Sequence, residues 1–295
     1  MFVVQVAPDF LSEASQMARA LPGNFGPIHS ELMKIFIDEF GYGVHRHKHS
    51  TLFERLLETM GLEARVHAYY YWYLPTSLLM TSYFYWVTVN KQRWYEYLGA
   101  LWWIEAVVPH FNRQLGKLVR RTFGEGIDTE YLDEHVGIDM HHRRMVLEKL
   151  IRPSVERHGE GILADVVRGI ESARLLGDVA ERDYLEQIAF CEGLEPRAGE
   201  PSGPPRAPLG AEGNAREISA GSGFLIEPRV VDEDASLEVV EGRVAVDGGY
   251  LRYRELSAGE SVRIPKGRMF GARVATERAL VRATPSLIGA VRAPS

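Results

Sequence analysis

The sequence EHVGIDMHH, residues 134–142, carries His135, Asp139 and His142 at positions i, i+4 and i+7. At about 100° per residue, these three side chains lie within roughly 60° of one helix face. Two imidazoles and a carboxylate on one stripe make half of a metal site of the kind that suits non-haem iron. A solvated, histidine-rich helix face would have the same spacing. Glutamates earlier in the chain therefore have to decide between the two interpretations.

The first 195 residues have the periodicity of helices joined by short connections. The expected helices span about 10–20, capped by Asp9, then 27–40, 49–60, a turn and helix over 68–89, 92–121, 129–158 with a kink at Pro153, and 161–191 with a break near Gly177. Gly41 and Gly43 suggest a kink or bulge rather than a helix end at that point. An all-helical bundle is the predicted fold of this part.

The composition changes at Pro196. Residues 196–216 hold five prolines and four glycines, which predicts a linker. Beyond it the periodicity becomes two, in runs at 223–226, 237–240, 243–246, 250–253, 261–264 and 279–282, with turns at 247–249, 258–260 and 265–267. We therefore predict a helical domain over 1–195, a linker over 196–216 and a small β-sandwich or barrel over 217–295.

Composition excludes several classes of protein. The 295 residues carry a net charge of −6 with mixed signs, which argues against nucleic-acid binding. Cys191 is the single cysteine, so a disulfide framework within the chain is excluded and a reducing cytoplasm is expected. The first residues lack the features of a signal peptide. Residues 69–89 carry no charge, but many Tyr, Ser and Thr and the interruption at Pro75 favour a buried turn and helix over a membrane span.

Four short patterns make the helical part resemble the haem-oxygenase-like diiron oxidases, over roughly residues 27–191. They are Glu39-Phe40-Gly41, His49-Ser50-Thr51-Leu52-Phe53, Glu105 within Trp102-Trp103-Ile104-Glu105-Ala106, and the His-x3-Asp-x2-His of the opening stretch. The resemblance implies that two ferrous ions are bound by six side chains: Glu39, His49, Glu105, His135, Asp139 and His142. It also implies dioxygen as a co-substrate.

One ligand remains open at this point. On an unbroken helix ten residues turn through about 280°, so Glu39 and His49 would not share a face. Asp38 or His45 would fit that face better. The two glycines between Glu39 and His49 offer the backbone freedom for a bulge that restores the pairing. Glu39 is therefore the expected ligand, with Asp38 as the alternative. Some relatives carry a further carboxylate where this chain has Arg46, which we expect instead to meet an anionic substrate group.

From about residue 222 to 285 the chain resembles a small cupin, through the segments 240–244, 258–261 and 264–267. Metal-binding cupins use histidines. This chain has none beyond His158, and Phe270 stands where the last of them is expected. No metal is therefore expected in the cupin. One member of the diiron family, an N-oxygenase that forms a nitrosourea, joins the same two folds, and its metal-loaded cupin performs a second reaction.

These resemblances predict a diiron oxygenase that oxidises a small nitrogen-containing metabolite, by N-oxygenation of an amino-acid-like amine, in natural-product biosynthesis. The alternatives are a diiron oxidase that cleaves C–C bonds of an amino acid or fatty acid, and a non-enzymatic protein that retains iron and binds a regulatory ligand. A haem oxygenase or metal-free thiaminase relative would leave the three carboxylates without a common role. The expected partners are a small-molecule substrate without nucleic acid or membrane; an external electron donor and a homodimer are both compatible with the resemblance.

Overall fold

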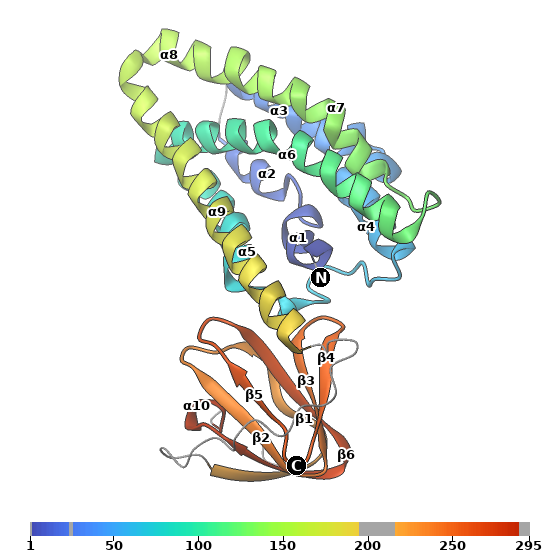
Figure 1. Cartoon of the computed structure of the whole chain (residues 1–295). Helices are drawn as coiled ribbons and strands as arrows, with labels where there is room; N and C mark the ends of the chain where they lie inside the picture. Colours follow the sequence, from blue (N-terminus) through green and yellow to red (C-terminus); the bar gives the residue numbers. More distant parts are fainter. Residues whose placement is uncertain (1, 24–25, 195–215, 289–295) are drawn as a thin grey trace. The chain divides into compact units, whose positions relative to one another are not determined.

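An all-helical unit and a unit built around an antiparallel β-sheet make up the chain (Figure 1). The computed structural model describes residues 2–23, 26–194 and 216–288. The helical unit comprises Val6–Ala68 and Pro75–Ala180, and the β unit comprises Met1–Gln5, Tyr69–Leu74 and Glu181–Ser295. The predicted fold class, helical bundle followed by a cupin-like β domain, is confirmed.

The α-helices before the sheet are α1 (Phe2–Phe10), α2 (Ser15–Ala20), α3 (Pro27–Glu39), α4 (His49–Thr59), α5 (Pro75–Val89), α6 (Trp94–Phe123), α7 (Glu130–Met145), α8 (Arg152–His158) and α9 (Leu163–Leu194). A π-helical turn at Val146–Ile151 joins α7 to α8, and 3-10 turns lie at Gly41–Gly43, His45–His47, Tyr70–Trp72, Lys91–Arg93 and Glu160–Ile162. None of the helices in the described ranges has an apolar stretch long enough to cross a membrane.

Two of the helix predictions are wrong. The expected first helix, 10–20, is replaced by α1 and α2, because Asp9 lies inside α1 and the chain turns over residues 11–14 with Ala14 at φ 59°. The expected break near Gly177 is absent and α9 continues through it. A Cβ at Gly177 would lie 3.0 Å from the Trp103 ring, so this glycine allows close packing rather than ending a helix.

The connection between α3 and α4 also differs from the predicted bulge. Helix α3 ends at Glu39, and α4 begins at His49 after two 3-10 turns. Gly41, Tyr42 and Gly43 all have positive φ, and a Cβ at Gly41 would lie 2.4 Å from the backbone carbon of His47. The backbone freedom that the glycines were expected to supply is therefore used in a full stop and restart of the helix.

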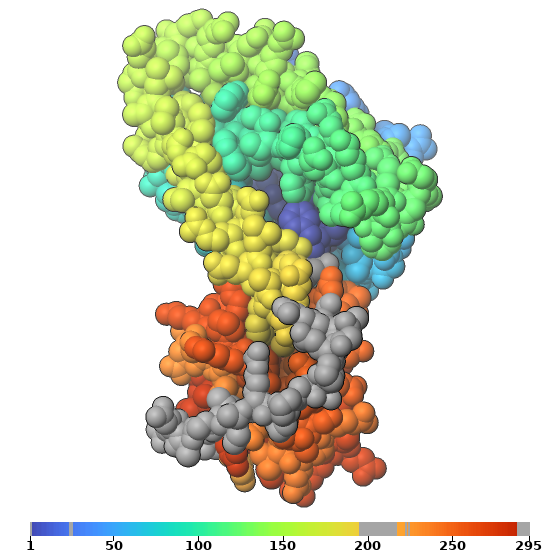
Figure 2. Space-filling view, viewed as in Figure 1, coloured from blue at the N-terminus to red at the C-terminus, as the bar shows by residue number. Residues whose placement is uncertain are grey.

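Close packing of α6 against α9 holds the helix that carries Glu105. A Cβ at Gly99 would lie 1.9 Å from the carbonyl oxygen of Val166, and one at Gly169 would lie 1.9 Å from that of Glu96. Only glycine therefore lets the two backbones approach this closely. In the space-filling view α9 lies beside α6 on the face drawn, and the start of the chain is visible between them (Figure 2).

The sheet consists of β1 (Arg216–Val230), β2 (Ala235–Glu241), β3 (Arg243–Gly249), β4 (Arg252–Ser257), β5 (Ser261–Ile264) and β6 (Met269–Ala283), followed by α10 (Pro285–Ile288). Its order is β4-β3-β6-β2-β5 with β1 also paired to β6, and each pairing is antiparallel. The strands curl into a half-barrel with an apolar interior that includes Phe270, Leu237 and Val246, each 0% exposed (Figure 1).

The end of α9 belongs to the β unit and packs on β3. The side-chain amide of Gln187 donates to the carbonyl of Gly248 at 2.6 Å, and a Cβ at Gly248 would lie 2.9 Å from Leu194. The turn predicted at 247–249 is therefore wrong: these residues lie in β3, and the glycine allows the helix to approach. The predicted linker, 196–216, lies outside the described residues apart from Arg216, where β1 begins.

Candidate metal centre

Buried carboxylates and imidazoles converge in the helical unit from several elements. The structure gathers five of the six side chains that the sequence predicts as ligands and adds Glu13 to them. They fall into two groups that share one member: Glu13, Glu39, His49 and His135 in the first, and Glu39, Glu105 and His142 in the second.

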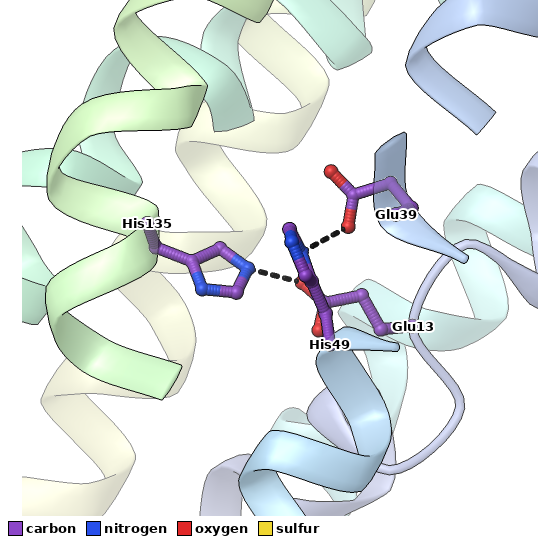
Figure 3. A group of neighbouring side chains, drawn as sticks. All are labelled: Glu13, Glu39, His49 and His135. Atoms are coloured by element: carbon purple, nitrogen blue, oxygen red, sulfur yellow. Dashed lines mark hydrogen bonds and ion pairs between the residues drawn. The ribbon is translucent and has the colours of Figure 1, made fainter. Parts of the chain in front are cut away.

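The first donor group is drawn in Figure 3. Its four ligand atoms all lie within 4.8 Å of one another. Nδ1 of His49 is 2.7 Å from Oε2 of Glu39, and Nε2 of His135 is 2.8 Å from Oε1 of Glu13. The side chains point toward one another from α3, α4, α7 and the turn between α1 and α2 (Figure 3). Four elements thus present ligand atoms to one point.

The second donor group meets the other oxygen of Glu39. Nδ1 of His142 lies 3.2 Å from Oε1 of Glu39 and 3.5 Å from Oε2 of Glu105. Glu39 therefore faces His49 with one oxygen and His142 with the other. A carboxylate with one oxygen in each group has the arrangement of a bridge between two metal ions.

Hydrogen bonds on the far side of two rings decide which nitrogen each one presents. Nδ1–H of His135 donates to the Tyr131 carbonyl at 2.7 Å, which leaves the lone pair of Nε2 facing the first group. Nε2–H of His142 donates to Asp38 Oδ2 at 3.2 Å, which leaves Nδ1 facing the second group. Such partners fix the tautomer and orientation of metal-binding histidines. Asp38, the alternative to Glu39 in the sequence, thus lies behind His142.

Several of the converging atoms are buried without a hydrogen-bond partner in the described part of the chain: Nδ1 of His49, Nδ1 of His142, Oε2 of Glu39 and Oε2 of Glu13. Leaving such atoms unpaired costs free energy comparable to a lost hydrogen bond, about 1–3 kcal/mol each. A metal ion at each group would satisfy them. Mixed imidazole and carboxylate donors suit ferrous iron, so the residues present fit an iron site.

The pKa values of the cluster reflect burial opposed by opposite charges. Burial by itself would lower the pKa of His135, but the Glu13 carboxylate outweighs it and raises the pKa to about 10. Burial would raise the pKa of Glu39, but His49 and His142 outweigh it and hold that pKa below its ordinary value. In the metal-free protein the imidazoles therefore hold protons where metal ions would otherwise supply positive charge.

The two remaining predicted residues differ in position. Asp139 is buried and lines the same cavity as Glu39 and Glu105, outside both donor groups. Burial and then the Glu105 carboxylate raise its pKa to about 9. Arg46 is exposed, its Nε donates to His47, and it does not line the cavity. The structure gives no support to a substrate role for Arg46, and the proposed site leaves it out.

Glu13 is the functional candidate that the sequence did not indicate. It lies in the turn after α1 and contacts His135, 122 residues away. The predicted helix 10–20 would have placed it among ordinary surface charges. No local spacing signals this contact, because the turn exists only through tertiary packing.

A cavity of about 640 Å³, including its mouth, lies beside the cluster in the helical unit. The helices α1, α2, α3, α5, α6 and α7 and the turn after α1 contribute its lining. Apolar side chains such as Phe84, Leu101 and Ile104 line one part, and carboxylates line the part beside the donor groups. The volume is within the usual range for a small-molecule site.

Comparison with known proteins assigns the chain to a family. The family described as iron-containing redox enzyme matches residues 1–178. The chain belongs to this iron-containing redox enzyme family. The predicted resemblance is confirmed, and the chain is an iron-dependent oxidoreductase. The carboxylate and histidine groups of the helical unit lie within the matched residues and are compatible with iron binding.

This redox enzyme is also similar to a curated protein, the nitrosourea synthase of Streptomyces achromogenes subsp. streptozoticus. The two are 41% identical over 284 residues, which cover 94% of this chain and 59% of the relative. The chain therefore spans less than two thirds of the length of that relative. The aligned region extends through both the helical and the β parts of the redox enzyme.

Removing Asp38 tests the orientation of His142 in this redox enzyme. We expect Asp38→Ala to lower iron affinity by about 10- to 100-fold, because the ring loses the acceptor that fixes its tautomer. Asp38→Asn should lose less, since its amide oxygen still accepts from Nε2–H. Competition with a chelator under anaerobic conditions measures the affinities.

Glu31→Gln provides the control for this series, because Glu31 lies on the same helix and pairs only with the exposed Lys34. Wild-type iron affinity in Asp38→Ala would show that Asp38 does not position the ring. Complete loss of one iron ion would instead show that Asp38 is itself a ligand.

Proposed function

We propose that the chain is a non-haem diiron oxygenase that uses dioxygen to oxidise a small nitrogen-containing metabolite in natural-product biosynthesis. The observation that carries the diiron assignment is the position of Glu39, with one oxygen in each donor group. The similarity to a nitrosourea synthase supports nitrogen as the oxidised atom.

The proposed ligand set joins the sequence prediction to the structure. One iron ion would be bound by Glu13, His49 and His135, the other by Glu105 and His142, and Glu39 would bridge them. Asp139, buried and directed to the same cavity, would complete the second ion's ligands. Iron bound there supplies the activation of dioxygen. The apolar part of the cavity lining keeps bulk water from the reacting atoms.

The reaction class sets the balance of atoms and electrons. In N-oxygenation one oxygen atom of dioxygen enters an N–H bond, and the other leaves as water. Two electrons from an external donor and two protons complete the equation. The protein's contribution is to position the substrate nitrogen beside the two donor groups and to move protons through its carboxylates.

Anaerobic loading of the protein with Fe(II), followed by exposure to dioxygen, tests this function. We expect two iron ions per chain, oxygen consumption that depends on an added amine, and a product heavier by one oxygen atom. One iron ion per chain would contradict the diiron assignment. A product shortened by carbon–carbon cleavage would contradict N-oxygenation, and iron loading without any amine-dependent oxygen consumption would favour an iron-retaining binding protein.

A further inference from the structure

The charges that line the cavity do not balance once two iron ions are counted. Five carboxylates line it, and no lysine or arginine does: the carboxylates are those of Asp9, Glu13, Glu39, Glu105 and Asp139. Two ferrous ions carry four positive charges, which match the four carboxylates of the proposed ligand set. Asp9 is then the one lining carboxylate without a countercharge.

Asp9 lies in the last turn of α1, away from the proposed ligands but on the same cavity. Its Oδ1 accepts a hydrogen bond from the hydroxyl of Thr81 on α5 at 3.4 Å. Burial and the neighbouring Glu13 raise the pKa of Asp9 to about 6, so that it is still mostly ionised at neutral pH. A buried carboxylate is costly unless an opposite charge or strong donors meet it.

Two further polar atoms of the lining are buried and unpartnered within the described part of the chain. Oε1 of Gln16 and the hydroxyl of Tyr97 have no hydrogen-bond partner, and the Tyr97 residue is 1% exposed. Native proteins rarely leave such groups unpaired. A ligand with several N–H donors would satisfy the Gln16 oxygen and the Asp9 carboxylate together.

The rest of the lining is apolar and limits the ligand to one with an aliphatic or otherwise apolar stem. The side chains concerned are Phe10, Met17, Phe84, Leu101, Ile104 and Val108. Ammonium and guanidinium groups on a short methylene chain combine a positive charge, N–H donors and such a stem.

We infer that Asp9, with Gln16 and Tyr97 beside it, forms a subsite for the cationic ammonium or guanidinium end of the substrate. This inference rests on the proposed function, because it places the substrate in the same cavity. The subsite selects substrates by charge and holds the cationic nitrogen end beside the donor groups. A neutral isostere would leave the Asp9 carboxylate buried and unpaired.

Binding of charged and neutral amino acids to the anaerobic, Fe(II)-loaded full chain tests the subsite. The probes are L-arginine and L-lysine, with L-citrulline and L-norleucine as their neutral counterparts, and calorimetry measures the binding. We expect at least one cationic probe to bind about tenfold or more tightly than its neutral counterpart. Equal affinities, or no binding of either cationic probe, would overturn the inference.

Variants locate the preference on the chain. Asp9→Asn is expected to reduce the preference for the cation to about twofold or less while the iron content stays at the wild-type value. Asp178→Asn, the same change on an exposed α9 residue paired with Arg174, should keep the preference. An Asp9→Asn protein that keeps it would overturn the assignment. The wild-type comparison of charged with neutral probes stands even if the variant does not fold.

The outcomes for this subsite and for the proposed function are distinguishable, because no dioxygen is present during the binding measurement. Preference for the cation without an N-oxygenated product on later aeration supports the subsite and contradicts the proposed function. Two iron ions per chain and amine oxidation without any charge preference do the reverse.

Discussion

Replacement of Glu39 by alanine is expected to remove iron from both donor groups, whereas Glu105→Ala should leave about one iron ion per chain. The reason is that Glu39 contributes an oxygen to each group, while Glu105 belongs only to the second. Turnover of Glu39→Ala should fall by roughly a thousandfold or more, since metal-ion catalysis supplies several kcal/mol of transition-state stabilisation. Iron per chain after anaerobic loading and oxygen consumption are the two measurements.

The matched control is Glu31→Ala on the same helix. Glu31 is exposed and pairs with Lys34, so its loss should change neither iron content nor turnover. Circular dichroism should show wild-type helical content in all three variants, because α3 packs through apolar residues such as Leu32 and Ile35. Equal iron loss in Glu39→Ala and Glu105→Ala would refute a bridging Glu39.

The extent to which the sequence predicted this site follows the range of each contact. His135, Asp139 and His142 lie on one helix, so their spacing alone places them on one face. Glu39 and His49 are separated by two turns whose positive φ values no helical wheel describes. Their pairing came from the resemblance, and Gly41 and Gly43 only showed that it was sterically feasible.

Contacts made by the tertiary fold were beyond the sequence. Glu13 meets His135 only because α1 ends early and the chain turns toward α7. The roles of the two neighbouring acids of α3 also depend on packing: Glu39 faces the donor groups, and Asp38 binds the opposite side of the His142 ring. The fold class was more accessible, since the change from helical to alternating periodicity beyond Pro196 is a local property of the sequence.

Iron affinity is expected to rise steeply with pH between about 6 and 8.5, with about three protons released as the site fills. In the metal-free protein the pKa of His135 is about 10 and that of Asp139 is about 9. Burial would lower the pKa of His142, but Glu105 and Glu39 outweigh it and hold it well above its ordinary value. All three groups thus hold a proton at neutral pH that iron must displace.

The same protons set the sign of the stability change in the metal-free protein. Each of these three pKa values is higher in the folded than in the unfolded chain, so the folded state binds more protons and its stability falls as pH rises. The stabilising contribution of the two histidines is complete below about pH 6.5 and is lost as pH rises toward 10, while ionisation of Asp139 is opposed up to about pH 9. Glu39, with a lowered pKa, stabilises above its unfolded value and loses that contribution only in acid.

Calorimetry in buffers of different ionisation enthalpy counts the protons, and melting of the metal-free protein from pH 6.5 to 9 tests the sign. The melting temperature should fall over that range, and the stabilisation conferred by Fe(II) should grow, because bound iron replaces the protons as the positive charge among the carboxylates. Asp139→Asn removes one titrating group at nearly constant size, so it should release about one proton fewer. Iron affinity that is independent of pH would mean that the buried carboxylates and imidazoles do not bind the metal.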